Sequence, residues 1–123
     1  MNKTIQVGAI FGALAVGIGA FGAHGLADIL ELQNRIATFE TGVKYHFYHA
    51  LALVMIGIIG HQPYPRKWLL WSSYGFTAGI LIFSGSLYVL SLTGITWLGA
   101  ITPIGGVAFI LGWIFLAIAV SSK

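Results

Sequence analysis

The chain has 123 residues, of which 58% are hydrophobic and only 7% are charged. Because soluble globular domains carry roughly a quarter charged residues, this composition excludes a small water-soluble fold and favours an integral membrane protein. The six basic residues are scattered along the chain, which argues against a nucleic-acid partner, and the absence of cysteine excludes disulfides and thiolate metal sites.

The first predicted membrane span runs from Ile5 to Ala23 and contains no charged residue. A helix needs about 20 mainly apolar residues to cross a bilayer. The run is longer than the roughly 7–15 apolar residues of a signal peptide, so we expect it to stay in the protein.

The next stretch, from Gly25 to Lys44, holds every acidic residue of the chain. Apolar residues recur within it at a spacing of three or four, at Ile29, Leu32, Ile36 and Phe39. This period is typical of an amphipathic helix. We therefore expect a short interfacial helix that lies along the membrane surface or caps the bundle.

Three further spans are predicted in the rest of the chain, at residues Tyr45–Gly60, Trp68–Leu90 and Pro103–Val120. A polar turn with two helix-stopping prolines, at residues 61–67, separates the first two of these. Thr102 is expected to be the N-cap of the last span, with proline at its first helical position. The sequence thus predicts an all-α, integral membrane four-helix bundle as a single domain over residues 1–123.

The basic residues favour one orientation of this bundle. With four spans, the termini and the turn at residues 61–67 share one side of the membrane. That side carries Lys3, Arg66, Lys67 and Lys123, and the other carries Arg35 and Lys44. Because positive charge is enriched in cytoplasmic loops, both termini are predicted to be cytoplasmic.

Small residues at four-residue spacing mark several helix faces: Gly8–Gly12, Ala9–Ala13–Gly17, Ala15–Gly19–Ala23, Gly75–Gly79 and Ala108–Gly112. Helices in lipid associate through close packing, which small residues permit. These faces can serve contacts inside the bundle or contacts with another copy, and both alternatives stay open.

Polar side chains in the predicted spans gather in the half away from the termini. They are costly in hydrocarbon unless they have partners, so we expect them to converge inside the bundle. The candidate ligand-binding or polar core cluster consists of His24, Glu40, Tyr45, His46, His49, Ser84, Ser86 and Tyr88. Trp113, near the middle of the last span, also needs a partner for its indole N–H.

The histidines of this cluster admit three interpretations. His46 and His49 are three residues apart and share a helical face. Together with His24 they are candidate ligands of a divalent metal or haem, since imidazole binds zinc, copper and iron. Alternatively, the rings hydrogen-bond to neighbouring hydroxyls or carbonyls and stabilise packing, or they contact a quinone or a lipid headgroup. The cofactor is therefore left open.

Four motifs occur in order along the chain: GAHGL at residues 22–26, TGVKYH at 41–46 with HAL at 49–51, FSGSLY at 83–88, and ITPIGG at 101–106. Together they resemble a domain-of-unknown-function family of small bacterial inner-membrane proteins that is similar to eukaryotic transmembrane protein 256. The resemblance covers nearly the whole chain. It implies a multi-pass protein of the bacterial plasma membrane, and it supplies no activity and no catalytic residues.

We expect a non-enzymatic accessory subunit or scaffold, because the chain has no extramembrane segment large enough for a soluble active site. Its expected partners are the lipid bilayer and either further copies of itself or a larger membrane complex. The alternative is a quinone-, lipid- or metal-binding protein that uses the His/Tyr/Ser cluster. A small transporter or channel is a third, less favoured alternative: it would need ionisable groups through both leaflets, and the cytoplasmic half supplies no acid or base, but a homo-oligomer could build a pore between its subunits.

Overall fold

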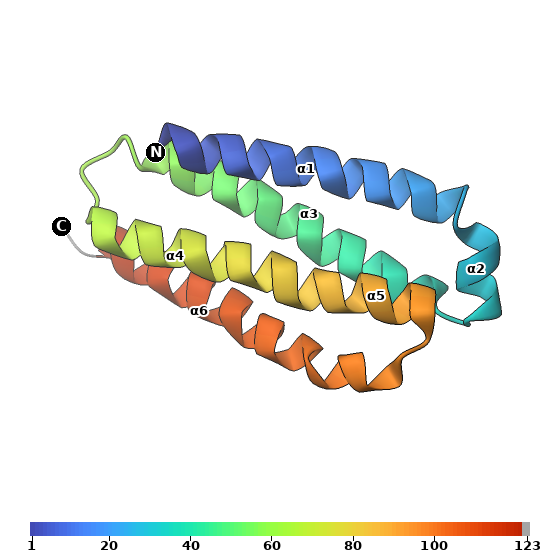
Figure 1. Cartoon of the computed structure of the whole chain (residues 1–123). Helices are drawn as coiled ribbons and strands as arrows, with labels where there is room; N and C mark the ends of the chain where they lie inside the picture. The colour runs from blue at the N-terminus through green and yellow to red at the C-terminus, as the bar shows by residue number, and fades with distance from the viewer. Residues whose placement is uncertain (122–123) are drawn as a thin grey trace.

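The computed structural model describes residues 1–121 (Figure 1). Its helices are α1 (Asn2–Ala23), α2 (Ala27–Leu32), α3 (Ile36–Ile59), α4 (Arg66–Gly79), the π-helical segment η1 (Ile80–Ser84), α5 (Gly85–Thr93), the 3₁₀ helix η2 (Thr96–Ala100) and α6 (Thr102–Ser121). Four helical stretches are long and apolar enough to cross a membrane: Asn2–Ala23, Ile36–Ile59, Arg66–Thr93 and Thr96–Ser121. The predicted all-α membrane bundle is confirmed. Lys123, which entered the orientation argument, lies outside the described residues.

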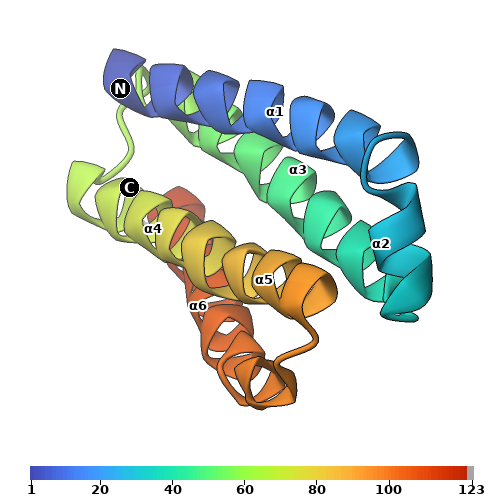
Figure 2. The same ribbon diagram turned by 45° about the vertical axis from the view of Figure 1, so that its right-hand side comes forward.

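The four long helical stretches lie side by side, with the N-terminus and the turn after α3 at one end and α2 at the other (Figure 1). They form two pairs, α1 with α3 and α4 with α6, and α3 joins the pairs by packing on α4, η1 and α5 (Figure 2). In the most apolar part of α3, 44% of the residues are buried, and the same share is buried in the α4–α5 helix. In α1 only 11% of the corresponding residues are buried. The centre of the fold is therefore α3 with α4–α5, and α1 lies at the periphery.

The segment from Gly25 to Lys44 differs from the expected single amphipathic helix. Only α2 forms separately, and α3 already begins at Ile36 and continues through Lys44 into the predicted second span. The break lies at Asn34, whose φ of 55° is in the left-handed region that asparagine tolerates better than most residues. Glu40 and Lys44 consequently belong to a spanning helix and not to an interfacial one.

Small residues bring the helix backbones together at both pair interfaces. A Cβ on Gly8 would lie 2.8 Å from the carbonyl oxygen of Ala50, and one on Gly75 would lie 2.9 Å from that of Ala108. Such distances leave no room for a side chain, so these glycines serve packing inside the bundle. Gly17, in contrast, has nothing within 4 Å of its Cβ position. One small-residue face of α1 therefore remains uncovered by the rest of the chain.

The third span contains a π-helical turn that the sequence did not predict. Residues Ile80–Ser84 form this turn between α4 and α5. A π-turn accommodates an extra residue in the helix and changes the direction of the side chains that follow it. Phe83 here packs against Gly105 of α6, and Ser84 faces α3. Phe83 and Ser84, which are adjacent in this turn, thus contact two different helices, α6 and α3.

Candidate functional site

His46 and Tyr88 form a buried polar pair between α3 and α5. The Nδ1 atom of His46 lies 2.8 Å from the hydroxyl of Tyr88, and only 3% of the histidine is exposed. The ring of Phe11 packs edge-on against the imidazole at 5.9 Å. At Nε2, no hydrogen-bond partner is found within residues 1–121. This pair therefore links α1, α3 and α5 through one imidazole ring.

Two serines of the third span add further links between helices. The Ser84 hydroxyl donates to the carbonyl oxygen of Gly42 over 2.7 Å. The Ser86 hydroxyl lies 2.6 Å from that of Thr102. Thr102 is the first residue of α6, and its side chain is used for this contact, whereas the sequence predicted it as an N-cap. Both serines are thus occupied by structural hydrogen bonds.

His49 joins α3 to α6, and its partners determine its protonation. Its Nδ1 lies 2.7 Å from the Tyr45 carbonyl oxygen, and its Nε2 lies 3.0 Å from the indole nitrogen of Trp113. A carbonyl only accepts and an indole N–H only donates, so His49 is neutral with its proton on Nδ1. The ring also stacks on Phe109, with centroids 3.6 Å apart. A proton on Nε2 would place two donors against each other.

Beside His49 lies an open groove between α3 and α6, called here the α3–α6 groove. Its volume is about 560 Å³, and it is lined by Tyr45, Tyr48, His49, Phe83, Gly106, Phe109, Ile110 and Trp113. Tyr45 and Tyr48 are 40% and 53% exposed, so both phenol rings border the surface that lipid would cover. The groove has aromatic walls and a few polar groups, which is typical of sites for small ligands.

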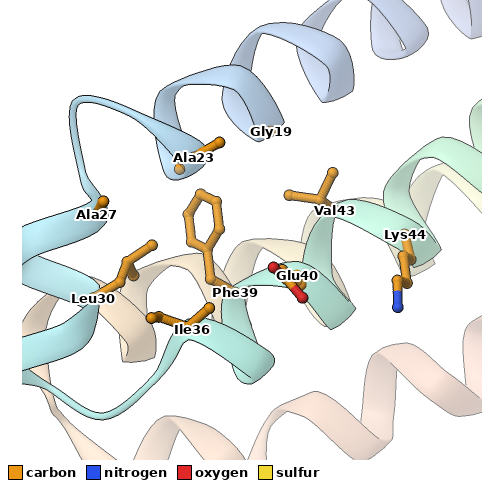
Figure 3. A pocket seen from close by; sticks show the side chains of 10 residues that line it. Gly19, Ala23, Ala27, Leu30, Ile36, Phe39, Glu40, Val43 and Lys44 are labelled. Carbon is orange, nitrogen blue, oxygen red and sulfur yellow. The ribbon is translucent and has the colours of Figure 1, made fainter.

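A second groove lies between α1, α2 and α3 and is called here the α1–α2–α3 groove. Its volume is about 390 Å³, and its lining residues are Gly19, Gly22, Ala23, Ala27, Leu30, Ile36, Phe39, Glu40, Val43 and Lys44. Figure 3 shows Phe39 and Val43 reaching from α3 towards Ala23 and Gly19 of α1. Glu40 and Lys44 lie one turn apart on α3, and in this view the Lys44 ammonium points away from α1. The groove is apolar except for this one acid and one base.

The predicted cluster of eight residues is thus divided among several places. His46 is joined to Tyr88, and His49 to the backbone of Tyr45; Ser84 and Ser86 bond to α3 and α6, and Glu40 lines the α1–α2–α3 groove. His24 is exposed at the end of α1. Within residues 1–121, no group of three His, Cys, Asp or Glu side chains is placed to hold a metal ion. The three histidine candidates for a metal are therefore not brought together.

Sequence reasoning did not find several residues of the grooves. Trp113 was singled out for its need of a partner, but its pairing with His49 could not be read from the chain order. Lys44 was placed in an interfacial helix, and Tyr48, Phe83 and Phe109 were not singled out. A useful signal was present for Lys44, because it lies one turn from Glu40 and directly before the apolar run of the second span.

Comparisons with known proteins agree with a membrane protein. Residues 18–106 match the family described as "Protein of unknown function (DUF423)". The chain is 46% identical over 119 residues to the UPF0382 membrane protein YwdK of Bacillus subtilis, a match that covers 97% of this chain and 96% of the relative. It is 48% identical over 120 residues to a UPF0382 membrane protein of Staphylococcus epidermidis, with 97% and 95% covered.

No solved structure matches the chain significantly. The family match and the relatives nevertheless cover most of its length, including all four motifs noted in the sequence. The chain belongs to the DUF423 family of membrane proteins.

Proposed function

We propose that the protein is a non-enzymatic component of a larger membrane assembly, formed with further copies or with other proteins. The observation that carries this proposal is the uncovered small-residue face of α1. Ala9, Ala13 and Gly17 are all exposed, and nothing lies within 4 Å of the Cβ position of Gly17. Small residues let another helix approach closely in lipid. A face of this kind, left free on the periphery of the bundle, suits a partner helix.

The state of the polar side chains supports a non-enzymatic role. General acid–base and nucleophilic catalysis need a group that is free to meet the substrate. Both nitrogens of His49 are engaged, and Ser84 and Ser86 bond to neighbouring helices. These groups are the ones that sequence reasoning proposed for chemistry. Their hydrogen bonds favour a structural use.

Purification from native membranes tests the assembly. We expect the protein to migrate with a mass well above that of a monomer in mild detergent. Gly17→Leu should reduce this mass because the larger side chain obstructs the α1 face. Gly85→Leu is a matched control, since Gly85 also has nothing within 4 Å of its Cβ position but lies on α5. A lone monomer in every condition, or equal effects of both changes, would contradict the proposal.

We further propose that the protein lies in the bacterial plasma membrane with both termini in the cytoplasm. Lys3, Arg66 and Lys67 lie at the end of the bundle that holds the N-terminus, whereas Arg35 is at the α2 end. This distribution follows the positive-inside rule. Because the chain has no cysteine, single-cysteine variants can be labelled from outside intact cells. A cysteine at Glu31 should be labelled and one at Gln62 should not; the reverse pattern would overturn the orientation.

A second candidate function is the binding of a lipid-soluble quinone in the α3–α6 groove. The groove opens to the bilayer, and its aromatic walls suit a flat ring, with the exposed phenols of Tyr45 and Tyr48 as hydrogen-bond donors. The specific observation that favours the quinone is the gathering of aromatic side chains beside an accessible groove.

Quinone binding can be tested by fluorescence. A short-chain ubiquinone or menaquinone should quench Trp113, and Trp113→Phe should identify its share of the signal among the four tryptophans. Gly106→Leu should abolish the quenching, because its Cβ would have ordinary contact at 3.9 Å with Phe83 and the rest of the side chain would extend into the groove. Quenching that Gly106→Leu leaves unchanged would argue against this site.

A further inference from the structure

Glu40 and Lys44 lie within a membrane-spanning helix. At a rise of about 1.5 Å per residue, Glu40 is about 6 Å and Lys44 about 12 Å along α3 from Ile36. The whole helix is about 36 Å long by the same rise, and a hydrocarbon core is about 30 Å thick. A centred α3 would therefore place Glu40 just below the interface and Lys44 about 9 Å deep.

These two charges have no partner within residues 1–121. Neither side chain makes a hydrogen bond or ion pair with any group of residues 1–121, and both side chains are exposed. Charged groups at this depth are costly, and in membrane proteins they pair with each other, with a bound molecule or with water. The compensating charges are thus expected from outside the chain.

The surroundings of the pair indicate the kind of molecule that supplies those charges. The α1–α2–α3 groove next to them is apolar, about 390 Å³ in volume, and bounded towards the membrane surface by Ala27 and Leu30 of α2. An apolar groove at a helix–helix junction suits an acyl chain, because its walls are as apolar as lipid. A molecule with one hydrocarbon part and two opposite charges fits both features.

The order of the charges matches the order within a zwitterionic phospholipid. In such a lipid the phosphate lies nearer the acyl chains, and the ammonium lies nearer the water. In α3 the base is the deeper group and the acid is the shallower one. A lysine side chain also extends towards the interface while its methylene groups stay in hydrocarbon, which brings its ammonium to phosphate depth.

We propose that the α1–α2–α3 groove binds one phospholipid with a primary ammonium in its headgroup, of the phosphatidylethanolamine type. Lys44 binds the phosphate, Glu40 accepts hydrogen bonds from the ammonium, and an acyl chain follows the apolar wall formed by Phe39 and Val43 (Figure 3). The site is independent of the α1 face that carries the proposed assembly, so either can fail alone.

Native mass spectrometry of the whole chain tests this site. The protein is reconstituted in vesicles of equimolar phosphatidylethanolamine, phosphatidylcholine and phosphatidylglycerol, and the lipid retained after detergent extraction is identified. We expect one retained phosphatidylethanolamine. Lys44→Gln should lower its retention about fivefold, the effect of one lost lysine–lipid contact. Glu40→Gln should shift the retained lipid towards phosphatidylglycerol, since the lysine then meets a phosphate without competition from the acid.

The charge-exchange variant Glu40→Lys with Lys44→Glu is the sharpest test. It preserves the net charge and the possibility of an internal pair, but it reverses the order of the charges along the helix. We expect it to lose the preference for phosphatidylethanolamine, whereas Lys44→Arg keeps it and controls for folding. Asp28→Asn, which removes an acid outside the groove, should change nothing. Equal retention of all three lipids by the unaltered protein, or an unchanged preference in the exchanged variant, would overturn the proposal.

Discussion

Helix α3 carries two kinds of polar side chain in opposite situations. His46 and His49 are nearly completely buried, and each is hydrogen-bonded within the chain, to Tyr88 and to Trp113 with the Tyr45 carbonyl. Glu40 and Lys44, on the preceding turns of the same helix, are exposed and have no partner in the described part of the chain. The two groups are neighbours in sequence, but only the histidines find their polar partners inside the protein.

This difference separates structural polar groups from groups that face an outside molecule. In hydrocarbon a polar side chain needs a partner, and the protein supplies it for the histidines. Removing such an internal partner should lower stability. Removing Glu40 or Lys44 should leave stability nearly unchanged and alter what the protein binds. The following changes test this separation, beginning with the largest expected effect on the free energy of unfolding.

The contact that holds Phe83 beside the His49 region should be the most sensitive. A Cβ on Gly105 would overlap the backbone of Phe83, so Gly105→Ala is expected to lower the free energy of unfolding by about 3 kcal/mol. Gly106→Ala is the matched control, because its Cβ would lie 3.9 Å from Phe83. Unfolding in mixed micelles measures both. Because alanine is the better helix former, Gly106→Ala should not lower stability; similar losses in the two variants would show that the contact with Phe83 is not the cause.

Tyr88→Phe removes the hydroxyl that pairs with His46. The imidazole would lose its side-chain hydrogen bond and keep only its approach to the Phe11 backbone, at a cost of about 2 kcal/mol. A double-mutant cycle with His46→Leu should show that most of this loss disappears when both side chains are apolar. Strictly additive losses would indicate that the two residues do not act as a pair.

The His49–Trp113 hydrogen bond should contribute less. His49→Phe keeps a ring against Phe109 but removes the acceptor, and we expect a loss of about 1 kcal/mol, the scale of a side-chain hydrogen bond between helices in a membrane. The tryptophan emission should also change as the indole N–H loses its partner. Combining this change with Trp113→Phe should give less than the sum of the two losses if the bond forms as described.

The smallest effect on folding is expected for Glu40→Gln and Lys44→Gln. Each should change the free energy of unfolding less than the changes above, because neither side chain makes a hydrogen bond or ion pair within residues 1–121 that the change would remove. Their effect should appear in the retained lipid instead. A large loss of stability without any change in the retained lipid would show that Glu40 and Lys44 have a structural role, as the histidines do, and do not face a bound lipid.

Much of the fold follows from the sequence, because hydropathy and spacing are local properties. The four spans, the prolines that end α3 and begin α4, and the glycines at the pair interfaces can all be read from short windows. The π-turn at Ile80–Ser84 cannot, because its residues pack against α3 and α6. The break at Asn34 was missed because a single left-handed residue interrupts an otherwise continuous helical spacing of apolar residues. For this reason the expected interfacial helix was too long and Lys44 was assigned to it.

The candidate sites were only partly predictable. His46, His49 and Tyr88 were selected correctly as polar groups needing partners, but the choice of partner depends on how each helix is rotated against its neighbours. Rotating α6 by one residue, about 100°, would turn Trp113 away from His49. The α1–α2–α3 groove was not predicted because its walls come from three helices, and an apolar wall has no local signal that separates it from an apolar core.

Composition and hydropathy alone determined that this chain dissolves in a bilayer as four helices, since transfer of apolar residues out of water depends on their number and not on their arrangement. Only the tertiary structure decided which polar side chains are satisfied inside the protein and which remain for an outside molecule. The physical reason is that a hydrogen bond or ion pair depends on distances of a few ångströms between residues far apart in sequence.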